Sequence, residues 1–149
     1  VALKYFEIVP MVVGQVEEED YRGIAGALKG ILREEDTLVV SSDFTHQGPR
    51  FGYVPYKEYV KENIRALDMG AVDRILQKDS RKFTQYVEDT GATICGRHPI
   101  SILLEMLPKQ AKGELLTYYT SGDIVGEETE TVSYASLAFE NSSGWAWDF

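Results

Sequence analysis

The pattern of hydrophobic and polar positions in the first third of the chain predicts a strand, a helix and a second strand. Residues 5–13 form an almost continuous apolar run, which predicts a short, mostly buried strand with Pro10 at an edge or a bulge. Residues 21–32 place their apolar side chains on one helical face, and residues 37–42 predict another buried strand. A strand, helix and strand in this order imply a right-handed crossover and a parallel strand pair.

The middle of the chain has helical periodicity. A long helical pattern covers 59–76, and a second helix starts at Asp79 or Ser80 and ends at Gly91. A third, strongly apolar helix covers residues 100–107. These segments predict helices that flank a sheet.

The last third of the chain returns to strand patterns. Segments 114–121 and 131–139 predict two strands joined by an acidic loop, and successive strands favour an antiparallel hairpin. The predicted fold class is therefore α/β, with an open mixed sheet of parallel strands, flanking helices and a C-terminal antiparallel hairpin. Residues 1–139 form one domain in this interpretation, and residues 140–149 form an aromatic tail.

Composition narrows the class of protein. With 149 residues, of which 44% are hydrophobic and 26% charged, the chain is typical of one globular domain. No apolar run is long enough to span a bilayer, so we expect no membrane insertion. The formal net charge of −9 disfavours nucleic-acid binding. A single cysteine agrees with a reducing compartment, and we expect a cytoplasmic location.

The stretch 93–100 concentrates reactive side chains. It holds the only cysteine, Cys95, together with Arg97, His98 and a proline, Pro99, suited to the first turn of a helix. A helix N-terminus and a nearby cation both favour a thiolate, and Arg97 and His98 can bind an anion there. The alternatives are that Cys95 is a small buried hydrophobic residue and that Arg97 and His98 form a salt bridge and a helix cap.

A second polar segment follows the second predicted strand. Residues 41–48 lie at the carboxyl end of that strand, which is where open α/β sheets bind ligands. Asp43 and His46 can form an acid/base pair there. The alternative is that Asp43 caps a turn and His46 bonds to the backbone.

Three aromatic residues are candidates for a pocket wall. Phe51 and Tyr53 lie in an aromatic loop, and Tyr134 lies on the last predicted strand. They can line a pocket for a peptide or a small-molecule ligand, or simply pack over a domain edge.

Three blocks of sequence together resemble the Memo family. They are Ser-Ser-Asp-Phe-Thr-His at 41–46 with Phe-Gly-Tyr at 51–53, Ile-Cys-Gly-Arg-His-Pro-Ile at 94–100, and Val-Ser-Tyr-Ala at 132–135. The middle block is the most specific. The resemblance corresponds to the C-terminal half of a family member, and the half that supplies further strands and two metal-binding histidines has no counterpart here.

The resemblance implies a fold related to the class III extradiol dioxygenases, which use non-haem iron held by two histidines and a carboxylate. Memo proteins have a cysteine at the third position, which Cys95 matches, whereas His46 matches the acid/base histidine of the dioxygenases. The implied cofactor is iron or copper, with an incomplete ligand set in this chain. The expected partner is the missing N-terminal half or another subunit.

Two functions follow as hypotheses. The first is metal-dependent redox or dioxygenase-like chemistry, with Cys95 as metal ligand, His46 as acid/base and Asp43 orienting His46. The second is a non-enzymatic adaptor that binds a peptide or phosphopeptide, because a phosphotyrosine ligand needs a cation and an aromatic wall. The residues of that pocket are Phe51, Tyr53, Arg97 and Tyr134. Metal content supports the first hypothesis and metal-independent peptide binding supports the second.

Overall fold

The computed structural model describes residues 5–33 and 35–140, and these form an α/β structure. In chain order the elements are α1 (Asp20–Lys29), β1 (His46–Gln47), the short 3-10 helix η1 (Pro49–Phe51), α2 (Val60–Leu76), α3 (Ser80–Thr90), α4 (Arg97–Met106), β2 (Lys112–Thr120), α5 (Ser121–Val125) and β3 (Thr131–Glu140). The predicted aromatic tail lies, from residue 141 on, outside the described residues.

The sheet is built around the predicted hairpin. β2 and β3 pair antiparallel, from Lys112 opposite Glu140 to Thr120 opposite Ser133, with one irregularity in register near Leu115. This confirms the hairpin, and the acidic loop between the strands contains the short helix α5. β1 joins the other edge of β3, also antiparallel, so the strand order is β1-β3-β2.

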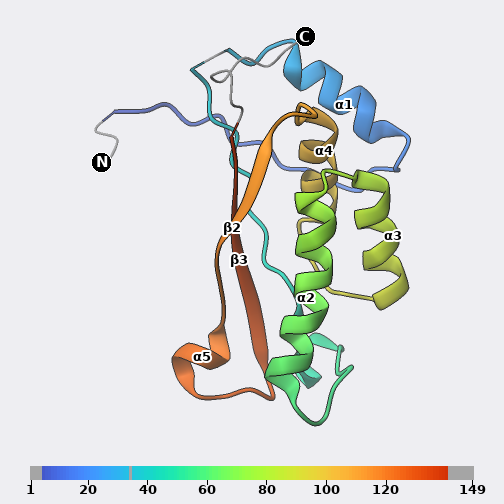
Figure 1. Cartoon of the computed structure of the whole chain (residues 1–149), viewed down its shortest axis with the longest axis vertical. Helices are drawn as coiled ribbons and strands as arrows, with labels where there is room; N and C mark the ends of the chain where they lie inside the picture. The colour runs from blue at the N-terminus through green and yellow to red at the C-terminus, as the bar shows by residue number, and fades with distance from the viewer. Residues whose placement is uncertain (1–4, 34, 141–149) are drawn as a thin grey trace.

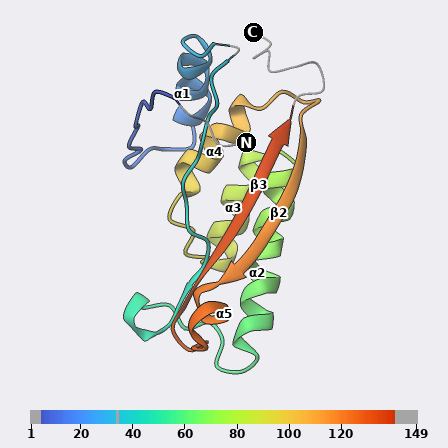
Figure 2. The ribbon, with the colours of Figure 1, turned by 90° about the vertical axis from the view of Figure 1, so that its left-hand side faces the viewer.

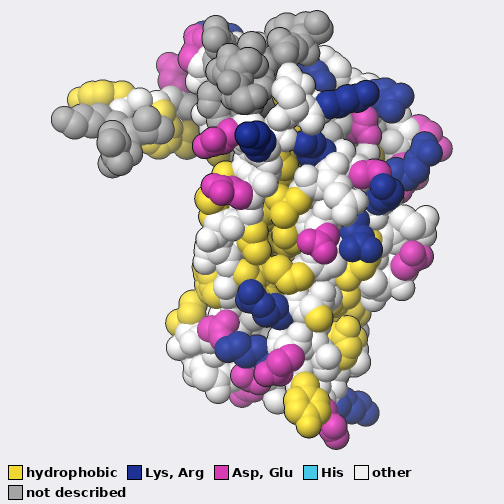
Figure 3. Space-filling model, viewed as in Figure 1, with side chains coloured by type: hydrophobic (Ala, Val, Ile, Leu, Met, Phe, Trp, Pro, Cys, Tyr) yellow, Lys and Arg dark blue, Asp and Glu magenta, His cyan; other side chains and the backbone are white. Residues whose placement is uncertain are grey.

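The predicted parallel strand pair is corrected for the described residues. Segments 5–13 and 37–42 run without regular strand structure, and the sheet of residues 5–33 and 35–140 is antiparallel throughout. The first segment is also solvent-exposed rather than buried, since Tyr5 is 96% and Val12 98% accessible. A strand needs a neighbour to accept its backbone hydrogen bonds, which periodicity alone cannot supply. In Figure 3 hydrophobic side chains of this segment project from the body at the upper left.

Local capping chemistry sets the helix ends. Asp79 is the N-cap of α3, where its carboxylate accepts from the Lys82 N–H at 3.0 Å, and Gly91 ends α3 in the left-handed conformation. α4 ends when Leu107, which precedes a proline, turns to an extended conformation. Helices α1 to α4 therefore lie close to their predicted positions.

The core lies between the hairpin and the helices. Figures 1 and 2 show β2 and β3 as one layer with α2, α3 and α4 on one side of it. The centre is formed by Phe83, Ala71 and Val72 with inward side chains of β3 such as Leu137. A second, smaller cluster packs helix α1 against helix α4, with Tyr21 and Ala25 from α1 and Ile102 and Met106 from α4. None of the helices in the described part of the chain is long and apolar enough to cross a membrane.

Candidate functional site

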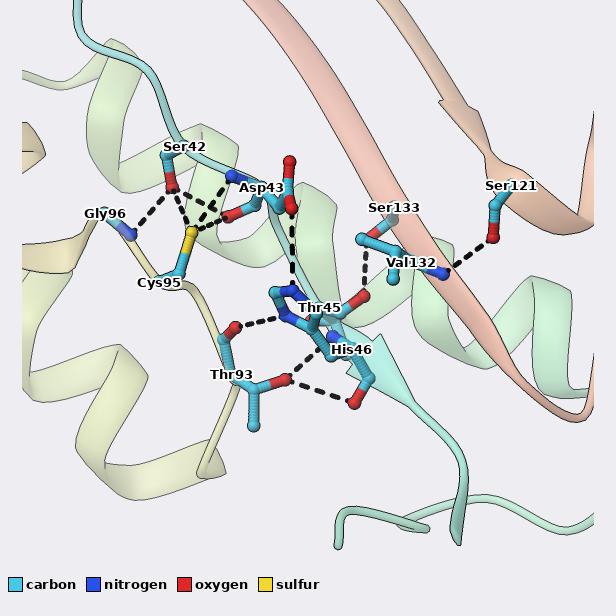
Figure 4. Close-up of polar contacts among 10 residues, drawn as sticks. All are labelled: Ser42, Asp43, Thr45, His46, Thr93, Cys95, Gly96, Ser121, Val132 and Ser133. Carbon is cyan, nitrogen blue, oxygen red and sulfur yellow. Dashed lines mark hydrogen bonds and ion pairs between the residues drawn. The ribbon is translucent and has the colours of Figure 1, made fainter. Parts of the chain in front are cut away.

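Two segments that are far apart in sequence lie side by side next to the sheet. The first leads into β1, and the second leads from α3 into α4 (Figure 4). The Gly96 N–H donates to Ser42 Oγ at 2.9 Å, and Ser42 Oγ donates to the Asp43 carbonyl at 2.7 Å. A Cβ atom at position 96 would overlap the side chain of Ser42. Glycine is therefore what allows the two segments to approach this closely.

Cys95 projects its thiol into this junction. Its Sγ accepts from the Asp43 N–H at 3.2 Å and lies 3.7 Å from Ser42 Oγ. The residue is solvent-exposed, so the interpretation of Cys95 as a buried hydrophobic residue is wrong. The thiol is thus held by backbone and hydroxyl groups while remaining open to solvent.

His46 is fixed from the same two segments. Its Nδ1 lies 2.9 Å from the Thr93 carbonyl oxygen, and its Nε2 lies 3.6 Å from Asp43 Oδ2. A carbonyl oxygen can only accept, so Nδ1 carries the proton and Nε2 of the neutral ring has the free lone pair. The Thr93 hydroxyl also accepts from the His46 N–H at 2.7 Å and donates to the His46 carbonyl at 3.2 Å.

Asp43 links the two reactive groups. Its backbone N–H contacts the sulfur of Cys95 and its carboxylate faces the imidazole of His46. The structure therefore brings Asp43, His46 and Cys95 into one cluster (Figure 4). Chemically, the cluster offers a thiol ligand or nucleophile and an imidazole whose Nε2 can exchange a proton with a carboxylate.

Two of the predicted aromatic residues border this cluster. The Phe51 ring meets the His46 ring edge-on, with centroids 5.3 Å apart. Tyr134 lies on β3 with its ring centroid 5.1 Å from that of Tyr119. Burial raises the pKa of Tyr134 above its ordinary value, and the negative charge of Asp43 raises it further. Phe51 is thus in contact with the histidine, whereas Tyr134 packs on Tyr119 and is influenced by the charge of Asp43.

The remaining predicted site residues have other partners. Tyr53 donates its hydroxyl to the Thr90 carbonyl at 3.1 Å and packs against the core. Arg97 donates from Nε to His98 Nε2 at 3.3 Å, and both residues lie in the first turn of α4 rather than in the preceding loop. Tyr53 is therefore bonded to a backbone carbonyl, and Arg97 and His98 are bonded to each other. These three residues do not join the cluster around Asp43.

His98 faces α1 instead of Cys95. Its Nδ1 lies 2.8 Å from the hydroxyl of Tyr21, a buried residue of α1. Since Arg97 donates to Nε2, the neutral ring carries its proton on Nδ1 and donates to Tyr21. Burial, and then the charge of Arg97, lower the pKa of His98 below its ordinary value.

The implied iron or copper site has too few ligands here. Among residues 5–33 and 35–140, no group of three histidine, cysteine or carboxylate residues could hold a metal ion. Cys95 offers an open sulfur and His46 offers the lone pair of Nε2, since its Nδ1 is bonded to a carbonyl oxygen, so two ligands at most are present. An open catalytic metal site usually has three protein ligands. The described residues therefore do not fit a complete metal centre.

Sequence reasoning missed two residues of this site. Ser42 bridges the two segments and Thr93 holds the backbone and ring of His46. Both lie inside the two segments that were predicted to hold the site residues, 41–48 and 93–100. Their position beside a reactive residue was the only available signal, because serine and threonine are common in any loop.

Comparison with known proteins supplies the family. Residues 1–138 match the model of the Memo family, described as Memo-like protein. Protein MEMO1 of Homo sapiens is 34% identical over 143 residues, which cover 89% of this chain and 48% of the relative. A MEMO1 family protein of Thermococcus kodakarensis is 31% identical over 144 residues, covering 91% of this chain and 50% of the relative. The chain thus spans about half the length of these curated relatives, and it belongs to the Memo family.

Proposed function

We propose that this chain carries the thiol-bearing half of a metal-dependent redox site of the dioxygenase-like type. In this proposal Cys95 is a ligand for iron or copper, His46 is the acid/base group and Asp43 orients the imidazole. The metal would supply redox chemistry when bound, and the chain's own residues would hold and move a proton at His46 Nε2.

One observation carries the proposal: an exposed thiol and an imidazole contact the same aspartate from different segments. The Asp43 N–H lies 3.2 Å from Cys95 Sγ and the Asp43 carboxylate lies 3.6 Å from His46 Nε2. The peptide-adaptor hypothesis receives less support, because Tyr53 and Arg97 are engaged with Thr90 and His98 instead.

The proposal includes a partner for the exposed apolar segment 5–13. Here Tyr5 and Val12 are almost fully accessible, and an exposed apolar run in an extended chain tends to pair with another strand. We infer that another polypeptide segment, from the rest of a Memo protein or another subunit, covers this segment and completes the ligand set. The half-length match to the curated relatives is consistent with this inference.

Anaerobic titration of the whole chain with copper(I) or iron(II) tests the ligand role. We expect weak, substoichiometric binding, because two protein ligands at most are present, together with a sulfur-to-metal absorption signature. The variant Cys95→Ser should lose that signature, while His46→Gln should keep it.

A signature that persists in Cys95→Ser would overturn the ligand assignment. Tight binding of one metal ion by the monomeric chain would overturn the half-site proposal while leaving Cys95 as a ligand. Analytical ultracentrifugation of the same samples identifies the oligomeric state in which the metal is bound.

A further inference from the structure

A carboxylate that the site description does not use is buried beneath the candidate site. Asp68 on α2 is fully buried, and both of its oxygens accept hydrogen bonds. Thr45 Oγ1 donates to Oδ1 at 2.7 Å and the Tyr118 hydroxyl donates to Oδ2 at 2.7 Å. Both partners are neutral hydroxyls, which makes this a costly group to bury.

The cation nearest in the sequence, Arg65, does not form an ion pair with Asp68. Arg65, which is exposed on the same helix, places its guanidinium 5.0 Å from the centre of the Tyr118 ring rather than on the carboxylate. Burial raises the pKa of Asp68 above its ordinary value, and the hydroxyls of Ser133, Thr45 and Tyr118 lower it in part. A group this costly is a candidate for a role beyond packing.

The bonds of Asp68 lead to the candidate site through one residue. Thr45 directly precedes His46, and its carbonyl oxygen accepts from both the N–H and the hydroxyl of Ser133 on β3, at 3.0 and 3.2 Å. Asp68 therefore ties α2 to the strand that begins with His46, and through Tyr118 it also ties α2 to β2. The side chain of Thr45 is completely buried, so this connection has little freedom to move.

We propose that Asp68 is a positioning residue for His46: its bond to Thr45 fixes the backbone from which the imidazole reaches the Thr93 carbonyl. The inference rests on the proposed function, since it concerns the same imidazole. Without the bond, the segment at Thr45 loses its anchor to α2, and the ring of His46 is no longer confined to the Nδ1–H tautomer that Thr93 selects.

Nitrogen NMR of the histidine rings in the whole chain tests this. The chain has two histidines, so His46 and His98 give separate signals, and His98 serves as the internal reference. At about pH 8, where ordinary histidines are neutral, we expect wild-type His46 to be a single Nδ1–H tautomer. In Asp68→Leu the His46 signals should move toward a tautomer mixture while the His98 signals stay in place.

A milder variant keeps the test decisive should Asp68→Leu not fold. Thr45→Val removes one hydroxyl of the same pair and should move the His46 signals in the same direction. Thr84→Val is the matched control, because Thr84 is also a buried threonine, with its hydroxyl bonded to the Arg81 carbonyl in α3.

Unchanged His46 signals in Thr45→Val would overturn the positioning role, as would equal movement in Thr84→Val. Equal movement of the His98 signals would also overturn it, since that pattern reports general loosening. Metal binding is not measured in this experiment, so failure of the proposed function and failure of the positioning role give different results.

Discussion

The imidazole of His46 and the backbone of Thr93 form a reciprocal pair. Thr93 accepts from the ring at 2.9 Å with its carbonyl, and its hydroxyl bonds to both the N–H and the carbonyl of His46. The orientation of the His46 ring is therefore fixed by Thr93, a residue that is distant in sequence. The direction of Nε2 toward Asp43 depends on this pair.

Replacing Thr93 with valine keeps the shape of the side chain and removes both hydroxyl bonds. We expect the free energy of unfolding to fall by about 1–3 kcal/mol, because a backbone donor of His46 loses its acceptor. Urea denaturation measures the change. Thr93→Ser, which retains the hydroxyl, should lose less than half as much, and equal losses would indicate that the methyl group matters instead.

The junction at Gly96 gives a second prediction. In Gly96→Ala the new methyl group would overlap Ser42, so we expect a loss of about 1–3 kcal/mol in the free energy of unfolding. Ser42→Gly removes the obstructing side chain. In that background Gly96→Ala should cost much less, and strictly additive losses in the double-mutant cycle would contradict the close approach.

The free energy of unfolding should depend on pH through the protonation of His98. Its folded-state pKa is lowered by burial and by Arg97, so the folded chain binds this proton less readily than the unfolded chain. The resulting stabilisation is complete above the ordinary value of 6.5 and is lost as the pH falls through the lower folded-state value.

Urea denaturation at a series of pH values tests the contribution of His98. His98→Gln cannot titrate, so its stability should fall less steeply than that of the wild type as the pH is lowered below about 6.5. Parallel curves for the two proteins would contradict a lowered pKa of His98 in the folded chain.

Two helical glycines should respond in opposite directions to alanine. Gly26 lies exposed on α1 with open space around it, so Gly26→Ala should stabilise the chain by up to about 1 kcal/mol through helix propensity. At Gly70 on α2, the added methyl group would overlap the Tyr86 hydroxyl, which donates to the Leu67 carbonyl at 2.8 Å.

We expect Gly70→Ala to be destabilising, because overpacking and the loss of that hydrogen bond together exceed the gain in propensity. Thermal unfolding of both variants measures the difference. A rise in unfolding temperature for Gly70→Ala would mean that Tyr86 moves aside at little cost.

Local signals predicted much of this fold. The period of the apolar positions located α1 to α4 and the hairpin, and Asp79 and Gly91 marked helix ends by capping chemistry. The parallel pair was wrong for the described residues because strand pairing depends on a neighbour. Segments 5–13 and 37–42 have strand-like sequences without a ladder beside them.

The site was predictable to the extent that its residues are chemically unusual. Asp43, His46 and Cys95 stood out as reactive groups at the ends of predicted elements. Asp68 did not, because an acid within a helix ordinarily faces solvent, and only packing shows that its helix turns it inward. Its partner Thr45 was equally inconspicuous.

The pairing of Asp43 with Cys95 spans 52 positions of the chain, and that of Ser42 with Gly96 spans 54. Closing a loop of that length costs entropy, and the docking of the intervening helices α2 and α3 helps to offset it. The thiol of Cys95 and the backbone N–H of Asp43 should therefore meet late in folding, after this helical pair has docked. The environment of the single cysteine is consequently a reporter of complete folding, available to a thiol-specific probe in stopped-flow experiments.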